Sequence, residues 1–170
     1  MLDAKVVRLL NEQINKEFYS AYLYLDFSNY YFDQELNGFG NWYKIQAQEE
    51  RDHAMLFLQY LLNNGERIEL EAIAKPDVAL ESNQAVLEAG LRHERYVTSL
   101  IHTIYEAAYA VKDFRTMQFL DWFVKEQGEE ESNAESLVKK YALYGSDPRS
   151  LYMLDSEMAG RVYAAPSLVL

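Results

Sequence analysis

Glu50 and His53 lie three residues apart in a segment whose neighbouring inward positions are apolar or aromatic. On an α-helix this spacing places both side chains on one face, so that they project toward the same point. A carboxylate and an imidazole arranged in this way are ligands for hard or borderline cations such as iron, manganese or zinc. A lone histidine is more often a core residue with satisfied hydrogen bonds, so the interpretation depends on what accompanies this pair.

Three further segments of the chain show the same interruption of an apolar helical stripe. The stripes, traced at steps of three and four residues, contain Leu10, Ile14, Glu17, Ala21 and Tyr24; Phe39, Tyr43, Gln46, Glu50, His53, Phe57 and Tyr60; Leu87, Gly90, Glu94, Val97, Ile101 and Ile104; and Leu120, Phe123, Gln127, Glu130, Ala134, Leu137 and Tyr141. The residues that interrupt them are Glu17, Glu50, His53, Glu94, Gln127 and Glu130. A single glutamate on an apolar stripe is readily explained by an error in the assigned helical register. Four separate register errors, each placing a metal-ligand residue on the inward face, are not a ready explanation.

Burying these carboxylates has a large energetic cost unless they are protonated, paired or bound to metal. No lysine or arginine lies on the four stripe segments. Divalent cations would supply the missing positive charge. The pattern therefore predicts a metal centre inside a helical bundle, with ligands from all four helices.

The elements that must position these residues are four long helices, predicted at residues 3–34, 38–64, 83–112 and 114–144. Asn37-Gly38 and Asn63-Asn64-Gly65 supply turn chemistry between and after the first two. Residues 66–82 contain Pro76 and no helical period, which indicates a long connection. Two short turns and one long connection predict an all-α four-helix bundle with a single crossover; ferritin-like folds are the established example of this topology.

A short fifth helix is expected to follow the bundle. Asp147-Pro148 supplies a cap and a proline at the first helical position. We expect this helix at residues 147–163, with Leu151, Leu154, Met158 and Val162 on one side. Residues 164–170 form a tail without a clear signal. The whole chain, 1–170, is predicted to be one domain with its bundle at about 3–144.

Composition limits the classes of function. The chain has 27 acidic and 16 basic residues, a net charge of -11 and no cysteine. The negative charge disfavours nucleic-acid binding and would attract cations, although it could equally serve solubility alone. Without cysteine there are no disulfides and no thiolate metal sites. No apolar run is long enough to span a bilayer and the N-terminus lacks a secretory pattern, so we expect a cytoplasmic protein without membrane or nucleic-acid partners.

The motifs resemble those of the bacterial non-haem ferritins over nearly the whole chain. They are Glu17, Glu50-Arg51-Asp52-His53, Glu94 and Glu126-Gln127-Gly128-Glu129-Glu130. By this resemblance, Glu17, Glu50 and His53 hold one iron. Glu50, Glu94 and Glu130 hold a second, with Gln127 hydrogen-bonded nearby.

The resemblance also implies a third iron site, formed by Glu49, Glu126, Glu129 and Glu130. A solvated acidic face is the alternative interpretation of these residues. Arg51 stands where the haem-binding relatives have methionine, so no haem is expected. Rubrerythrins and bacterioferritins have a second Glu-x-x-His motif where this chain reads Gln127-Gly128-Glu129-Glu130, which favours a storage ferritin.

The expected function is oxidation of Fe(II) by O2 or H2O2 and storage of ferric oxide in a homo-oligomeric cage of 24 subunits. Two alternatives stay open: a di-iron oxidase or peroxidase that stores no mineral, and a non-enzymatic helical interaction module. Tyr24 is expected to be a core residue with a secondary redox or hydrogen-bonding role beside Glu17. His93 and His102 lie off the stripes and are expected at the surface.

Overall fold

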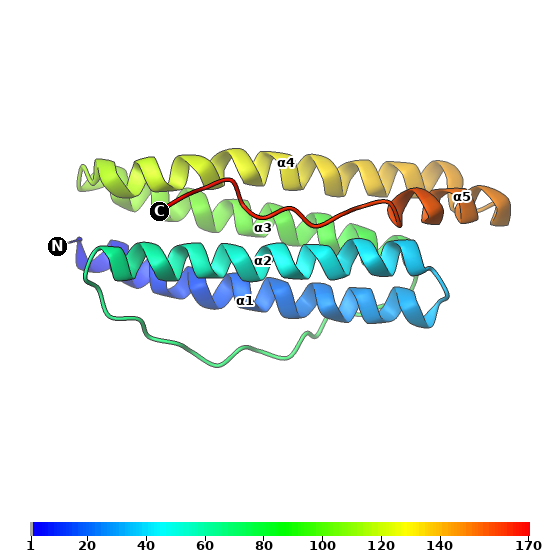
Figure 1. Cartoon of the computed structure of the whole chain (residues 1–170), viewed down its shortest axis with the longest axis horizontal. Helices are drawn as coiled ribbons and strands as arrows, with labels where there is room; N and C mark the ends of the chain where they lie inside the picture. The colour runs from blue at the N-terminus through cyan, green and yellow to red at the C-terminus, as the bar shows by residue number, and fades with distance from the viewer. Residues whose placement is uncertain (1) are drawn as a thin grey trace.

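A computed structural model describes residues 2–170 of the chain, and five α-helices account for its regular structure (Figure 1). They are α1 (Ala4–Asp33), α2 (Asn37–Asn63), α3 (Asn83–Ala110), α4 (Phe114–Tyr144) and α5 (Pro148–Met158). Residues 2–170 contain no β-strand. The predicted all-α bundle with one long crossover and a short fifth helix is confirmed. Within the same residues, no helix has the length and apolar composition needed to cross a membrane.

The bundle consists of two antiparallel helix pairs. Helix α1 packs against α2, α3 packs against α4, and α1 also contacts α3. Residues 64–82 run back along the length of the bundle, so that α3 starts at the end where α2 starts (Figure 1). This crossover places the middle of each helix at the same level, which allows side chains from four helices to converge.

The helix ends carry side-chain caps, among them the predicted cap at Asp147. Asp113 accepts a hydrogen bond from the Thr116 backbone N–H at 3.1 Å, and Asp147 accepts one from Ser150 at 2.8 Å. Gly65 adopts the left-handed conformation after α2, with φ 74°, a region that glycine enters without a steric penalty. These contacts satisfy backbone groups that have no partner inside the helix.

The turn between α1 and α2 differs from the prediction. Asn37 and Gly38 lie inside α2, and Glu35 takes the left-handed turn conformation, with φ 59°. Gly38 serves close packing instead: a Cβ at this position would lie 1.7 Å from the backbone oxygen of Asp155 in α5. The glycine therefore lets α5 approach α2.

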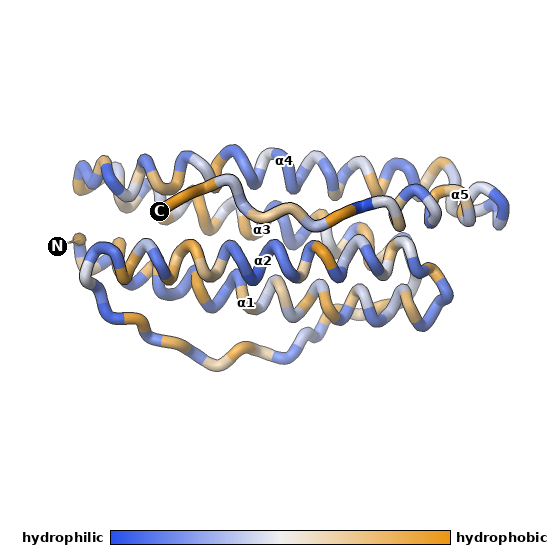
Figure 2. Tube along the Cα trace, in the orientation of Figure 1, coloured by the Kyte–Doolittle hydropathy of each residue, from blue (hydrophilic) through white to orange (hydrophobic). Residues whose placement is uncertain are grey.

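The core has two apolar clusters, one toward each end of the bundle. The first contains Phe57, Phe119 and Phe123, with the Phe57 and Phe123 ring centroids 4.2 Å apart. The second contains Tyr31 and Phe39, which stack at 5.2 Å. In α1 to α4, a buried polar layer lies between the parts of each helix that belong to these clusters; its residues are Glu17, Glu50, His53, Glu94, Gln127 and Glu130. Apolar and polar segments alternate along the helices in Figure 2. The buried polar layer is thus enclosed by apolar packing on both sides.

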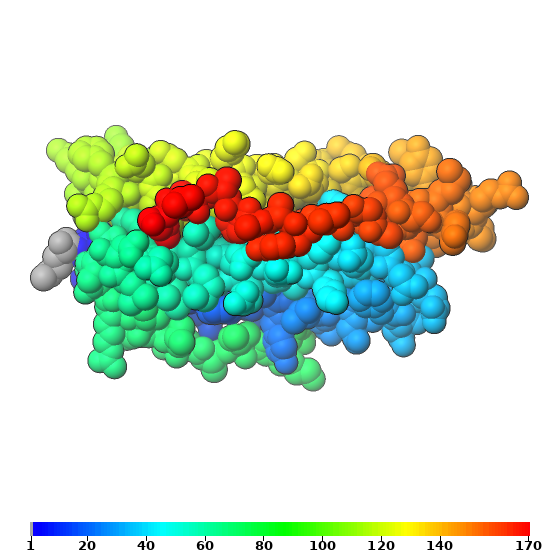
Figure 3. Space-filling model, viewed as in Figure 1, coloured from blue at the N-terminus to red at the C-terminus, as the bar shows by residue number. Residues whose placement is uncertain are grey.

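The C-terminal region departs from the predicted helix of residues 147–163. Helix α5 ends at Met158, and Val162, expected on its apolar side, is 81% exposed. Residues 159–170, here called the C-terminal strap, continue from α5 along the bundle over α2 and α4 (Figures 1 and 3). Arg161 contacts α2, and Ser167 accepts a hydrogen bond from Trp122 of α4 at 2.9 Å.

Candidate metal centre

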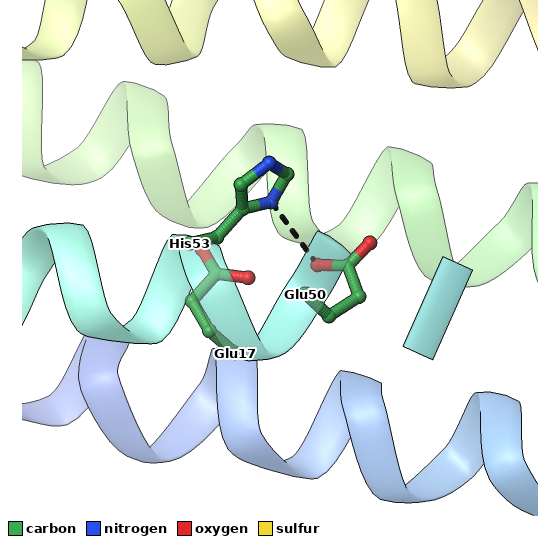
Figure 4. Close-up of side chains that lie close together, drawn as sticks. All are labelled: Glu17, Glu50 and His53. Carbon is green, nitrogen blue, oxygen red and sulfur yellow. Dashed lines mark ion pairs between the residues drawn. The ribbon is translucent and has the colours of Figure 1, made fainter. Parts of the chain in front are cut away.

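Glu17, Glu50 and His53 form a compact group of ligand types inside the bundle (Figure 4). One ligand atom from each residue lies within 4.8 Å of the others, and all three residues are at most 2% exposed. Glu17 comes from α1, while Glu50 and His53 come from adjacent turns of α2. The predicted convergence of these three residues is therefore present in the fold.

Two atoms of this group lack the partners that buried polar atoms normally have. Glu17 Oε2 and His53 Nδ1 are buried and make no hydrogen bond within residues 2–170. His53 Nδ1 lies 3.4 Å from Glu50 Oε2, in the range of an ion pair but outside hydrogen-bond geometry. Unsatisfied buried oxygen and nitrogen atoms are costly. A metal ion bound by these atoms would satisfy both, so the residues present fit a cation.

Glu94 of α3 and Glu130 of α4 lie beside a small cavity next to this group. The cavity measures about 20 Å³ and is also lined by Tyr24 and Gln46. That volume holds about one water molecule or ion. Glu94 is 3% exposed and Glu130 is 6% exposed. Both carboxylates are thus enclosed in the polar layer, although neither belongs to the three-residue group.

Amide side chains hold the carboxylates of this layer in place. Gln127 Nε2 donates to Glu94 Oε2 at 3.2 Å, a hydrogen bond of the kind that the family resemblance implied. Gln46 Nε2 donates to Glu50 Oε1 at 3.1 Å and to Glu130 Oε2 at 2.8 Å, joining α2 to α4. Amide groups here fix carboxylates without adding charge.

Sequence reasoning missed Gln13, which donates to Glu17 Oε1 at 2.8 Å and is 2% exposed. The signal was present: Gln13 precedes Glu17 by four residues, as Gln46 precedes Glu50. Residues four apart are neighbours on a helix surface. A glutamine one turn before a buried glutamate is therefore a recognisable support for a ligand.

The electrostatics of the layer reflect crowded buried carboxylates. Burial and then the charge of Glu50 raise the pKa of Glu17 to about 8 and that of Glu130 to about 8. The same two causes raise the pKa of Glu94 well above its usual value.

The direction in which the pKa values of Glu50 and His53 shift is set by the attraction between these two residues. Burial opposes charge on both residues, but their mutual attraction prevails. It lowers the pKa of Glu50 and raises the pKa of His53 to about 10. The apoprotein thus keeps one ionised carboxylate in the layer beside a charged imidazole, and metal binding must displace protons from the other ligands.

Tyr24 lies fully inside the layer and donates a hydrogen bond from its hydroxyl to Glu94 Oε1. It was expected beside Glu17, but its recorded partner is Glu94. Burial and the nearby carboxylates raise its pKa well above the usual value. Tyr24 is therefore a neutral donor that orients one carboxylate.

The four residues expected to form a third site occupy different environments. Glu130 is buried, Glu49 and Glu126 are half-buried, and Glu129 is exposed. Glu49 makes an ion pair with Arg161 of the C-terminal strap, a contact that sequence reasoning did not anticipate. A cation from the protein itself therefore already binds one of these carboxylates.

The surface placement expected for His93 is wrong. His93 is half-buried and its Nε2 lies 2.7 Å from Ser20 Oγ, which links α3 to α1. Burial lowers its pKa. His102 is exposed, as expected. Helical periodicity underestimates burial at the flanks of a stripe, because neighbouring helices cover more than the central line.

Comparison with known proteins places this arrangement in a family. The family model for ferritin, described as a ferritin-like domain, matches residues 7–143. This chain belongs to the ferritin family. A bacterial non-heme ferritin from Campylobacter jejuni is 39% identical over 155 residues, which cover 91% of this chain and 93% of that protein. A bacterial non-heme ferritin from Staphylococcus epidermidis is 35% identical over 163 residues, covering 96% of this chain and 98% of that protein.

Solved ferritin structures are similar to the whole chain. An open-pore ferritin from the hyperthermophilic archaeon Archaeoglobus fulgidus superposes with a TM-score of 0.93 at 42% identity, covering 95% of this chain and 100% of that one. An engineered closed form of the Archaeoglobus fulgidus ferritin gives a TM-score of 0.94 at 41% identity, covering 96% of this chain and 100% of that one. The resemblance to the ferritins is thus confirmed in sequence and in fold.

Proposed function

We propose that this ferritin oxidises Fe(II) at its buried carboxylate layer and stores the product as ferric oxide inside a cytoplasmic cage of 24 subunits. The observation that carries the proposal is the pair of unsatisfied buried atoms, Glu17 Oε2 and His53 Nδ1, which lie in a group of ligand types that spans α1 and α2. Membership of the ferritin family supports the choice of iron.

In this proposal the ligands divide into two sets that share Glu50. Glu17, Glu50 and His53 hold one Fe(II). Glu50, Glu94 and Glu130 hold the second. Gln127 and Tyr24 orient Glu94, to which both are hydrogen-bonded. The remaining acidic residues, Glu49, Glu126 and Glu129, together with Glu130, offer a third position for iron.

The chemistry follows from the donor set. Anionic oxygen ligands stabilise Fe(III) more than Fe(II), because the higher charge is neutralised more strongly. Each of two Fe(II) ions loses one electron. One O2 takes both electrons and two protons to become H2O2, or one H2O2 takes them and becomes two water molecules. Hydrolysis of the Fe(III) then releases protons and yields the hydrated oxide.

A storage role requires a closed assembly with an internal space. Twenty-four copies of a 19.8 kDa chain give a particle of roughly 475 kDa. Closed symmetric assemblies repeat the same few interfaces, so the contact surfaces of one chain are enough to build the whole assembly. Similarity to solved ferritins over 95% of this chain supports this assembly.

Glu50→Ala tests the assignment of the oxidation site. Glu50 is shared by both ligand sets, so this variant should lose rapid Fe(II) oxidation in stopped-flow absorbance while keeping its assembled mass. Glu135→Ala is the matched control, because Glu135 pairs with Lys139 on the surface of α4. Its oxidation rate should equal that of the wild type. An unchanged oxidation rate in Glu50→Ala would show that Fe(II) is not oxidised at this position.

A further inference from the structure

Gln46 of α2 connects the buried carboxylates to the C-terminal strap. Its amide nitrogen donates to Glu50 Oε1 at 3.1 Å and to Glu130 Oε2 at 2.8 Å. Its amide oxygen accepts a hydrogen bond from Arg161 Nη1 at 2.8 Å. The whole residue is buried, at 4% exposure. The amide of Gln46 therefore has carboxyl groups at its nitrogen and a guanidinium at its oxygen.

The guanidinium of Arg161 selects the direction in which this amide faces. An amide turned over would point its oxygen at both carboxyl groups and its N–H groups at the guanidinium. A guanidinium carries N–H donors and no acceptor, so it can bind only the oxygen of the amide. Arg161 thus stabilises the orientation in which Gln46 donates to the two glutamates. Hydrogen bonds donated to a carboxylate favour its anionic form, which is the form that binds metal ions.

Arg161 is itself held in a defined orientation. Its side chain is 15% exposed, and its guanidinium lies 4.1 Å from the Trp42 ring centroid. Nη2 pairs with the carboxylate of Glu49, and Nη1 also donates to the Trp42 backbone oxygen at 3.4 Å. Stacking on an aromatic ring and pairing with a carboxylate both constrain the planar guanidinium. Glu49 therefore takes one side of the guanidinium and leaves Nη1 directed at Gln46.

The backbone that carries Arg161 is attached to α2 both before and after this residue. Before it, the Phe39 backbone N–H donates to Asp155 Oδ1 of α5 at 3.0 Å. After it, the Tyr163 hydroxyl donates to Asp52. The strap lies along the surface of the bundle in this region (Figure 3). Contacts outside the carboxylate layer thus fix where Arg161 lies, as a positioning role requires.

We propose that Arg161 is a positioning residue for the metal centre, on which it acts through the amide of Gln46. Its hydrogen bond keeps the amide nitrogen of Gln46 directed at Glu50 and Glu130, which holds both carboxylates in the arrangement that binds a metal ion. Arg161 itself contacts neither of these ligands. This inference rests on the proposed function, because it takes Glu50 and Glu130 as metal ligands.

The charge of Arg161 and its hydrogen bond have opposite effects on metal binding. A positive charge beside the layer repels a metal cation, so removing the charge alone should tighten binding. Removing the hydrogen bond lets the Gln46 amide turn, which should weaken binding. The charge of the guanidinium is largely balanced by its ion pair with Glu49. We therefore expect the loss of the hydrogen bond to dominate.

The test is a titration of the whole assembled apoprotein with Co(II), followed by visible absorption. Binding at the layer is the part of the absorption that Glu50→Ala abolishes. Gln46→Leu loses direct contact with two ligands and should weaken this binding by roughly tenfold or more. Arg161→Leu acts at one remove and should weaken it by about three- to tenfold. Arg8→Leu is the matched control, since it makes the same change in an exposed ion pair with Glu12, and its affinity should equal that of the wild type.

Two further variants separate action through Gln46 from a general effect on the fold. In Gln46→Leu/Arg161→Leu the second substitution should cause no further weakening, because the amide through which Arg161 acts is absent. Arg161→Lys keeps the charge, but its single ammonium pairs with Glu49 and leaves the Gln46 oxygen without a donor. It should therefore weaken Co(II) binding as Arg161→Leu does, and it decides the question if Arg161→Leu fails to assemble.

Unchanged or tighter Co(II) binding in Arg161→Leu or in Arg161→Lys would overturn the inference. So would an equal weakening by Arg161→Leu in the presence and in the absence of Gln46. These results would leave the proposed function standing. A wild type that binds no Co(II), or whose Co(II) absorption survives in Glu50→Ala, would instead overturn the proposed function and this inference with it.

Discussion

Tyr24 of α1 donates its hydroxyl hydrogen bond to Glu94 of α3 across the interior of the bundle. Both residues are buried, at 1% and 3% exposure. Gln127 of α4 holds the other oxygen of the same carboxylate at 3.2 Å. Glu94 is thus oriented by two neutral donors from two other helices, and its position depends on both.

Removing the Tyr24 hydroxyl should loosen Glu94 without disrupting the fold. Glu94 becomes charged once metal binding displaces its proton. A hydrogen bond to a charged group contributes about 1.5–3 kcal/mol, so we expect Tyr24→Phe to slow Fe(II) oxidation several-fold in stopped-flow measurements. Tyr31→Phe is the control, because the Tyr31 hydroxyl donates to the Asn83 backbone oxygen and not to a carboxylate of the layer. It should lower stability and leave the rate unchanged. Equal rates in both variants would show that Tyr24 has no part in positioning Glu94.

The raised pKa values predict how the stability of the apoprotein changes with pH. Glu17 and Glu130 have pKa values of about 8 in the fold, compared with 4.5 for an ordinary glutamate. Between these values the folded chain binds more protons than the unfolded chain, so stability falls as pH rises. His53, raised to about 10 from 6.5, acts in the same direction. The lowered pKa of Glu50 changes the stability of the fold only at acidic pH.

We therefore expect the Tm of the metal-free protein, measured by calorimetry, to decrease between pH 5.5 and 8.5. Glu130→Gln should show a smaller decrease, because its amide does not titrate. Adding Zn(II), which is redox-inert, should reduce the slope, since bound metal replaces the protons. A Tm that rises over this range in the metal-free wild type would contradict the assigned protonation states.

Two glycines in helices predict opposite effects of one substitution. At Gly38 a Cβ would lie 1.7 Å from the Asp155 backbone oxygen, whereas at Gly128 no atom lies within 4 Å of it. Gly38→Ala should separate α5 from α2, lowering the Tm and increasing hydrogen exchange in α5. Gly128→Ala should stabilise α4 by up to about 1 kcal/mol through helix propensity. A Gly38→Ala variant with unchanged Tm and unchanged hydrogen exchange in α5 would show that α5 is not docked as described.

The bundle and most of the candidate ligands could be predicted because their signals are local and periodic. Glu17, Glu50, His53 and Glu94 each interrupt an apolar stripe, and all four are buried where the stripes predict. The helical period fixes which side chains point inward, and the crossover aligns the four interruptions. Helical periodicity does not determine which metal ion each residue binds, so these roles stay part of the proposal.

The C-terminal strap could not be predicted, for a physical reason. Arg161 and Glu49 are 112 positions apart, and the strap has no regular period that would place it on a helix. Its contacts depend on where α5 ends, and the sequence predicted five more residues of helix, to residue 163. The role of Gly38 was also hidden, because a Gly in a turn and a Gly at a helix contact look alike in sequence.

The most direct test of the account is aerobic addition of excess Fe(II) to the purified apoprotein, followed by size-exclusion chromatography and iron analysis of the protein peak. If the protein stores iron, hundreds of iron atoms should elute with a particle of roughly 475 kDa, given the 19.8 kDa chain. Uptake that stops at two or three ions per chain, with the remaining iron precipitating outside the protein, would contradict storage and indicate a di-iron oxidase.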